Sequence, residues 1–188
     1  GKLLLALLMS LRGTAFLYQG DELGLPHGDV PFERLRDPEA IAFWPHGIGR
    51  DGARTPMPWK RDYNMAGFTV AADAWLPLDP RHRARAVDTQ DGDDHSVLAF
   101  TRAIIALRRS SAALRGGDFT LLDAPEPLLA FERRHASERM ACVFNLGAQP
   151  MRWPLLAQPK TVRLTSGDAV LAENEAVLGA YSSLLLEM

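Results

Sequence analysis

The chain has 188 residues, and 21 Lys and Arg against 23 Asp and Glu give it a formal net charge of −2. Apolar residues make up 47% and charged residues 23% of the chain, which is typical of a globular protein and excludes collagen, a coiled coil and a disordered chain. A nearly neutral chain also lacks the basic excess of a protein that coats nucleic acid, so we expect no nucleic-acid partner.

The first expected element is a helix over about residues 1–11, followed by Gly13, which is a typical helix terminator. Its apolar run at residues 3–9 is too short to span a membrane, so we expect no membrane partner. Because the chain starts with Gly and no capping residue precedes the run, we expect it to begin in mid-helix and to be a fragment of a longer protein.

A short apolar run at residues 14–18 predicts a buried strand, and a helix followed by such a strand is typical of an α/β protein. From Gln19 to about Asp91, frequent prolines and glycines break any long regular element. Loops of this length are usually functional or disordered, and the aromatic residues in this one argue against disorder. A second helix is expected at residues 94–114, where apolar residues recur at helical spacing before Gly116 and Gly117.

After residue 117, short runs with strand character are separated by turn signals. These runs lie at residues 119–122, 128–133, 140–145, 160–165 and 181–186. Their spacing predicts a small antiparallel β-sandwich. We therefore expect two domains, residues 1–116 and 117–188.

The single cysteine, Cys142, excludes an internal disulfide and a cysteine-rich zinc site. It lies in an apolar run, which favours a small buried side chain over a redox or nucleophilic role. The usage is compatible with a reducing compartment, and we expect a cytoplasmic location. The histidines show no spacing typical of metal ligands, so we expect no metal and no cofactor.

The densest group of charged and aromatic residues is the segment 50–59, RDGARTPMPW. The guanidinium groups of Arg50 and Arg54 suit paired hydroxyls or a carboxylate. Alternatively, Arg–Asp pairing and Trp59 as an aromatic plug simply hold the loop together, and the spacing alone favours this alternative. Asp21 and Glu22 follow the predicted strand. We favour a structural role over a catalytic one for both acids, either as acceptors for loop backbone or as partners of an arginine.

The ordered segments 13–24 (GTAFLYQGDELG), 50–57 (RDGARTPM) and 66–69 (AGFT) resemble the C-terminal part of an α-glucosidase of the α-amylase family. The similarity is to its oligo-1,6-glucosidase and sucrose-isomerase group, and it covers residues 1–115 well. It implies the last part of a TIM (β/α)8 barrel: residues 1–11 as helix 7, 14–18 as strand 8, the long loop, and 94–114 as helix 8. The following sandwich matches the family's C-terminal β domain.

The resemblance also implies where catalysis resides. Retaining glycoside hydrolysis needs two carboxylates, which the family carries on earlier barrel strands, and a third acid belongs to an Asn-His-Asp motif. No asparagine here begins such a motif, so we assign no catalytic residue and expect the carboxylates upstream of Gly1. This chain alone is expected to be inactive.

Two substrate-binding residues follow from the resemblance. Arg50 matches the family arginine that pairs with an upstream aspartate at the closed end of the sugar pocket and so gives exo action. Arg54 is a second candidate, and a role in bracing the loop is favoured for it. Pro58 stands where the family usually has Gln and Asp21 where Glu is common, which puts the contacts on the acceptor side in doubt.

The function implied is that of a retaining exo-acting α-glucosidase, which hydrolyses small α-glucosides or sucrose once the missing N-terminal barrel portion is present. One alternative is a sucrose-isomerising or transglucosylating relative. Another is a catalytically degenerate partner subunit, and relatives of that kind carry a membrane segment before the barrel. A third is a sandwich that binds polysaccharide through Trp153 and Tyr181, although core packing is favoured for both side chains.

Overall fold

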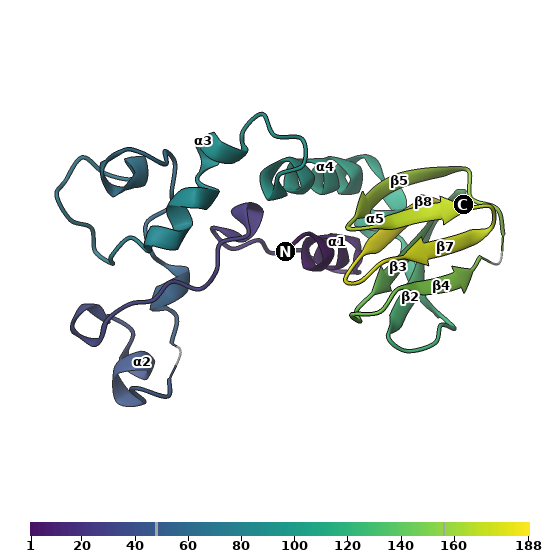
Figure 1. Ribbon diagram of the computed structural model, residues 1–188. Coiled ribbons are helices and arrows are strands. Elements are labelled where there is room, and N and C mark those ends of the chain that lie inside the picture. Colours follow the sequence, from purple (N-terminus) through teal and green to yellow (C-terminus); the bar gives the residue numbers. More distant parts are fainter. Residues whose placement is uncertain (48, 156) are drawn as a thin grey trace. The chain divides into compact units, whose positions relative to one another are not determined.

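The computed structural model describes residues 1–47, 49–155 and 157–188 (Figure 1). Its packing defines two compact units, which we call the β unit (residues 1–16 and 101–188) and the loop unit (residues 17–100). The limits of these units differ from the domain boundary expected at residue 117, because the units reflect packing within this chain alone. The division into a barrel part and a β-sandwich domain at residue 117 stays a prediction for the complete protein.

The described helices are mostly short. They are α1 (Lys2–Ser10), η1 (Asp21–Leu23), η2 (Phe32–Arg34), α2 (Pro38–Ala42), η3 (Asp51–Ala53), η4 (Asn64–Gly67), η5 (Pro80–Arg85), α3 (Val87–Gln90), α4 (Val97–Ser110) and α5 (Ala112–Gly116), where η marks a 3-10 helix. No helix of the described chain is long and apolar enough to cross a membrane.

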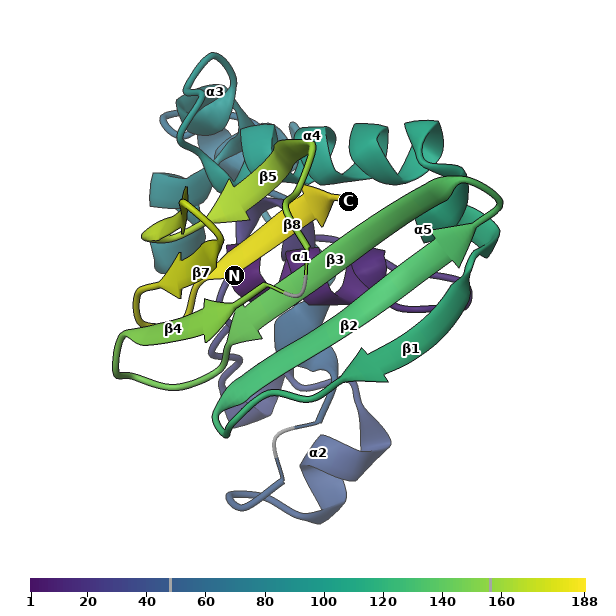
Figure 2. The ribbon, with the colours of Figure 1, turned by 90° about the vertical axis from the view of Figure 1, so that its right-hand side faces the viewer.

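The β unit contains two antiparallel sheets. The strands are β1 (Asp118–Leu122), β2 (Leu128–His135), β3 (Glu138–Asn145), β4 (Met151–Pro154), β5 (Thr161–Ser166), β6 (Ala169–Ala172), β7 (Glu175–Leu178) and β8 (Ser183–Glu187). One sheet has the order β1-β2-β3-β8-β5 and the other the order β4-β7-β6. Figure 2 shows the long strands β1, β2 and β3 side by side, with β8 between β3 and β5.

The two sheets enclose an apolar core. Ala130 of β2 pairs with Val143 of β3, which in turn pairs with Leu184 of β8. Successive strand residues point to opposite faces, so these three side chains share one face of the larger sheet. They belong to the same buried cluster as Trp153 of β4 and Leu178 of β7. This packing confirms the antiparallel sandwich predicted from the sequence.

The other face of the larger sheet is covered by helices. Phe131 and Phe144 stack on this face with ring centroids 5.6 Å apart, and α5 packs on β2 and β3 while α1 packs on β3. Strand β3 is therefore buried on both faces. This explains its continuous apolar sequence, which does not alternate as it does in a strand with one exposed face.

Two arginines bind the C-terminal end of α1. The fully buried Arg133 donates from Nη1 to the Ser10 carbonyl at 2.6 Å and from Nη2 to the Gly117 carbonyl at 2.9 Å. Arg108 donates to the carbonyls of Met9 at 2.5 Å and Gly13 at 2.6 Å. The last carbonyls of a helix have no hydrogen-bond partner inside it and carry partial negative charge. The two arginines supply hydrogen-bond donors for these carbonyls and positive charge that offsets the partial negative charge.

Some elements differ from expectation. The predicted strand at residues 14–18 is not a strand, because a strand is held by hydrogen bonds to a neighbouring one and no described strand pairs with it. The predicted helix 94–114 is divided at Ser111, whose Oγ accepts from Leu114 N at 3.1 Å and caps α5. The short strands β4, β6 and β7 were not predicted. The assignment of residues 1–116 to particular parts of the barrel stays a prediction.

The two aromatic side chains considered for polysaccharide stacking have different environments. Trp153 is buried in the sandwich core and donates from Nε1 to the Asp123 carbonyl at 3.1 Å, as the favoured interpretation required. Tyr181 precedes β8 and is exposed, so the prediction of core packing is wrong for it. Its φ of 50° lies in the left-handed region, which is typical of turns. Tyr181 is therefore a turn residue before the strand and not part of the sandwich core.

Cys142 is fully buried in β3, and burial raises the pKa of its thiol to about 12. The thiolate is the reactive form, so we expect no labelling of the native protein by iodoacetamide at pH 8 and complete labelling after denaturation in urea. Mass spectrometry measures both. Rapid labelling of the native protein at pH 8 would contradict this placement of the thiol.

Candidate functional site

The motif segment 50–55 lies beside the chain that follows residue 18. Gln19 donates from Nε2 to the Thr55 carbonyl at 3.2 Å, and Gly28 N donates to the Gly52 carbonyl at 2.9 Å. Two stretches far apart in the sequence are thereby joined within the loop unit. Specific polar contacts therefore connect distant parts of the irregular segment that starts at Gln19.

Arg50 forms a two-pronged ion pair with Asp37. Its Nε donates to Oδ2 of Asp37 at 2.8 Å and its Nη2 to Oδ1 at 3.0 Å, while the backbone N of Arg50 donates to Oδ2 at 2.8 Å. The Asp37 side chain is fully buried, whereas 61% of the Arg50 side chain is exposed. Hydrogen bonds from Arg50 hold the pKa of the Asp37 carboxyl well below its usual range, and the same bonds raise the pKa of Arg50.

Asp37 is itself fixed by its neighbours. Its Oδ1 accepts from Glu39 N at 3.1 Å, so it caps α2, whose first residue is Pro38. Its backbone N donates to Oδ2 of Asp51 at 2.8 Å, and Arg36 N donates to the same oxygen at 2.6 Å. The other oxygen of Asp51, Oδ1, is buried and has no hydrogen-bond partner among the described residues.

These contacts change the interpretation of the motif as a self-contained loop. The partner of Arg50 is Asp37, outside the motif, and Asp51 binds backbone N–H groups. Trp59 is exposed, so it does not act as a plug. The Arg54 side chain is half-buried and forms no hydrogen bond or ion pair within the described ranges. Its roles in binding and in bracing the loop both stay predictions.

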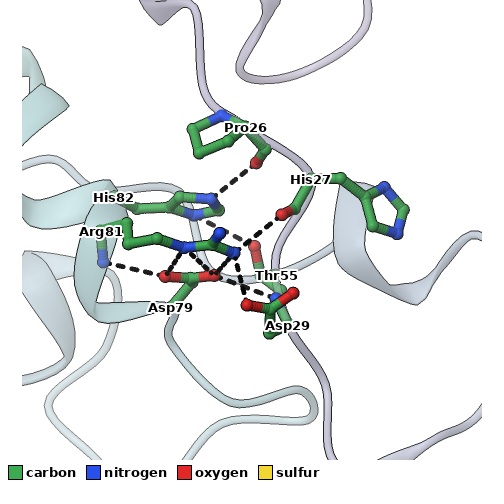
Figure 3. A network of polar contacts seen from close by, with 7 residues as sticks. All are labelled: Pro26, His27, Asp29, Thr55, Asp79, Arg81 and His82. Atoms are coloured by element: carbon green, nitrogen blue, oxygen red, sulfur yellow. Dashed lines mark hydrogen bonds and ion pairs between the residues drawn. The ribbon is translucent and has the colours of Figure 1, made fainter.

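A second polar network joins residues 26–29 to residues 79–82 (Figure 3). The buried Asp79 accepts from Arg81 Nε at 3.0 Å, from Arg81 Nη2 at 2.6 Å and from Asp29 N at 2.9 Å. Arg81 also donates to the His27 carbonyl at 3.0 Å and pairs with the Asp29 carboxylate at 3.0 Å. Hydrogen bonds from Arg81 hold the pKa of Asp79 well below its usual range.

His82 completes this network. Its Nε2 lies 2.8 Å from the Pro26 carbonyl, which can only accept, so this nitrogen carries the hydrogen. Its Nδ1 lies 3.3 Å from Oγ1 of Thr55, which can donate to it when the ring is neutral. The imidazole is buried and occupied on both nitrogens, and we assign it a structural role.

Two hollows border these networks. One of about 710 Å³ is lined by residues that include His27, Asp29, Trp44 and His46. A smaller one of about 210 Å³ is lined by residues that include Tyr18, Asp21, His27 and His82. The larger hollow is therefore bordered by aromatic and polar residues, a combination typical of sites for small polar ligands.

The adjacent acids Asp21 and Glu22 serve the local backbone. Oδ2 of Asp21 accepts from Tyr18 N at 2.9 Å, and Oε2 of Glu22 accepts from Gly20 N at 2.8 Å. These contacts agree with the structural role favoured for both acids, in its form as acceptors for loop backbone. No group of three or more His, Cys, Asp or Glu that could hold a metal occurs in the ranges that the structure covers.

Gly52 lies where no side chain fits. A Cβ at this position would overlap the His27 ring and the Gly28 carbonyl, and a backbone group cannot turn aside. We therefore expect Gly52→Ala to lower the free energy of unfolding by about 2 kcal/mol or more through overpacking. Thermal unfolding measures this. Gly116→Ala is the matched control, because a Cβ there meets no atom within 4 Å; an equal decrease for both variants would contradict the packing at Gly52.

Comparison with known proteins shows the family to which this chain belongs. A model of the α-amylase catalytic domain matches residues 1–117. The chain therefore belongs to the α-amylase family. Its relatives include α-glucosidases, oligo-1,6-glucosidases and sucrose isomerases, and the chain matches a C-terminal portion of them.

Particular relatives narrow the comparison. The chain is 45% identical over 145 residues to a probable α-glucosidase of Rhizobium meliloti, covering 77% of this chain and 26% of that protein. The structure of the α-glucosyl transfer enzyme XgtA aligns with a TM-score of 0.85 and 41% identity, over 99% of this chain and 35% of XgtA. A MutB variant in complex with the substrate sucrose aligns with a TM-score of 0.88 and 26% identity, over 99% of this chain and 37% of MutB.

Proposed function

We propose that the complete protein is a retaining exo-acting α-glucosidase that hydrolyses small α-glucosides or sucrose. This chain would supply the end of the catalytic barrel and the β-sandwich that follows it. The observation that carries the proposal is the motif segment with its exposed Arg50, in a chain similar to a probable α-glucosidase and to a protein solved with sucrose.

In this mechanism, this chain binds the sugar and the rest of the barrel supplies the reacting carboxylates. One carboxylate attacks the anomeric carbon to form a covalent glucosyl-enzyme, and an acid protonates the leaving oxygen. Arg50 would bind hydroxyls of the non-reducing glucose and close the pocket behind it, so that one glucose is removed at a time. Arg54 is the second substrate-binding candidate. No residue of this chain is assigned to the chemical step.

Glucosyl transfer is the second candidate function. It is supported by the similarity to XgtA, which is described as an α-glucosyl transfer enzyme. Hydrolysis and transfer share the glucosyl-enzyme and differ in whether water or a sugar attacks it. A catalytically degenerate subunit is not favoured by these relatives. A cytoplasmic location and the absence of nucleic-acid and membrane partners stay predictions.

Product analysis of the complete protein tests the proposal. With maltose, isomaltose and sucrose as separate substrates, we expect glucose as the main product, and longer or isomeric sugars if transfer dominates. Loss of all three substrates at the rate of an enzyme-free control would contradict an active enzyme. The chain of 188 residues alone is the second control, and we expect it to be inactive because one end of a barrel cannot close the sheet.

A further inference from the structure

We propose that Asp37 is a positioning residue of the sugar site, which fixes the Arg50 guanidinium so that its Nη1 group is presented to the substrate. The inference rests on the proposed function, because it needs Arg50 to contact the sugar. Asp37 would not touch the substrate itself and would act only through Arg50.

The first step of the argument is the geometry of the ion pair. Asp37 engages one edge of the guanidinium, the edge formed by Nε and Nη2, with two hydrogen bonds of 2.8 and 3.0 Å. Such a two-pronged pair fixes the plane of the guanidinium as well as its position. Nη1 forms no hydrogen bond within the part of the chain that the structure describes, and the side chain is 61% exposed. Its free donors are therefore held in one direction.

The second step is the rigidity of the support. Asp51 is 1% exposed and accepts the backbone N of Asp37, and Asp37 is fully buried and accepts three N–H groups of Arg50. The buried Asp51 therefore fixes the backbone of Asp37, and the Asp37 side chain in turn fixes the exposed Arg50 side chain. An arginine that is already ordered loses little conformational entropy when a ligand binds, so the support should strengthen ground-state binding.

The third step is a comparison within the same unit. Asp79 also precedes a proline, caps a helix and pairs with an arginine through two bonds. Its arginine, Arg81, additionally donates to the His27 carbonyl and pairs with Asp29, so that pair ties segments of the loop unit together. Asp79 is therefore a matched control for a buried Asp–Arg pair with a purely structural role.

The experiment measures steady-state kinetics of the complete enzyme on maltose or sucrose. Asp37→Asn keeps the volume and the ability to cap α2, and it removes the carboxylate that holds Arg50. We expect KM to rise about 10-fold with kcat within about 3-fold of the unchanged enzyme. Arg50 would bind sugar hydroxyls and not the reacting atoms, so its contact is expected to be equally strong in the ground state and the transition state. Asp79→Asn is expected to leave KM within about 2-fold, even where it lowers the unfolding temperature.

Two variants of Arg50 separate failure of the positioning role of Asp37 from failure of the sugar contact of Arg50. Adding Asp37→Asn to Arg50→Ala should raise KM no further, because the positioned group is already gone. Arg50→Lys keeps a positive charge next to the buried Asp37. It should also raise KM about 10-fold, because an ammonium lacks the fork that binds both carboxylate oxygens of Asp37 at once. This variant keeps the inference testable if Asp37→Asn does not fold.

Each result supports or overturns a defined statement. If Arg50→Ala raises KM but Asp37→Asn and Arg50→Lys do not, the positioning role of Asp37 is overturned and the proposed role of Arg50 stands. If Arg50→Ala leaves KM unchanged, the sugar contact under the proposed function is overturned, and the inference with it. An equal rise in KM for Asp79→Asn and Asp37→Asn would show a general loss of structure and overturn the inference.

Discussion

Replacing Arg133 by methionine is expected to lower the free energy of unfolding by about 3 kcal/mol. The guanidinium is fully buried and donates to the carbonyls of Ser10, Gly117 and Asp118. Methionine has a similar length but no donor, so buried carbonyl groups would lose their partner at the end of α1 and the start of β1. Burial lowers the pKa of Arg133, and its hydrogen bonds to carbonyl groups keep the cation satisfied.

Scanning calorimetry of the complete protein measures this effect. A loss of this size would lower the unfolding temperature of a domain of 150–250 residues by roughly 6–12 °C, and we expect a smaller decrease, still above about 2 °C, in the longer complete protein. Arg134→Met is the matched control, because Arg134 is the next residue of β2 and its side chain is exposed. Shifts below 2 °C for both variants would show that Arg133 does not hold α1 to the sheet.

Replacing Arg50 by alanine is expected to lower kcat/KM of the complete enzyme about 100-fold, mostly through KM. The variant removes the charged donor that we propose binds the non-reducing sugar, and it leaves the buried Asp37 carboxylate without its partner. Steady-state kinetics on maltose and sucrose measures the change.

Alanine variants of two other arginines provide comparisons for the effect of Arg50→Ala on kcat/KM. Arg54→Ala should lower kcat/KM less than 10-fold if its main role is to brace the loop. Arg61→Ala is the control, because its side chain is 60% exposed, close to the 61% of Arg50, and its nearest carboxylate lies 3.9 Å away. A decrease for Arg61→Ala equal to that for Arg50→Ala would show a general charge effect and would remove the specific role of Arg50.

The sandwich could be predicted because its longer strands carry strong local signals. Runs of β-branched, aromatic and leucine residues between turn residues located β1, β2, β3, β5 and β8 to within a few residues. The strands β4, β6 and β7 have four residues each, which is too short for an alternating pattern to stand out. The segment 14–18 has strand composition, but pairing decides whether a strand forms, and composition does not specify a partner.

The candidate site could be predicted only in part. The family resemblance of the motif segment led to Arg50, but its partner Asp37 lies 13 residues earlier in irregular chain, where no periodicity relates the two. A usable signal was present, since Asp37-Pro38 and Asp79-Pro80 both have the capping residue and first-turn proline of a helix start. That signal locates both buried carboxylates, although only the structure shows which arginine each one binds.

The most direct test of the proposed function is the configuration of the first glucose released. Proton NMR of the complete protein acting on sucrose or p-nitrophenyl α-glucoside in heavy water follows the anomeric signals before mutarotation, because each of these substrates releases only one glucose unit. The account predicts that α-glucose appears first from the non-reducing end, as a covalent glucosyl-enzyme requires. Initial release of β-glucose would contradict the retaining mechanism, and a substrate left intact would contradict an α-glucosidase altogether.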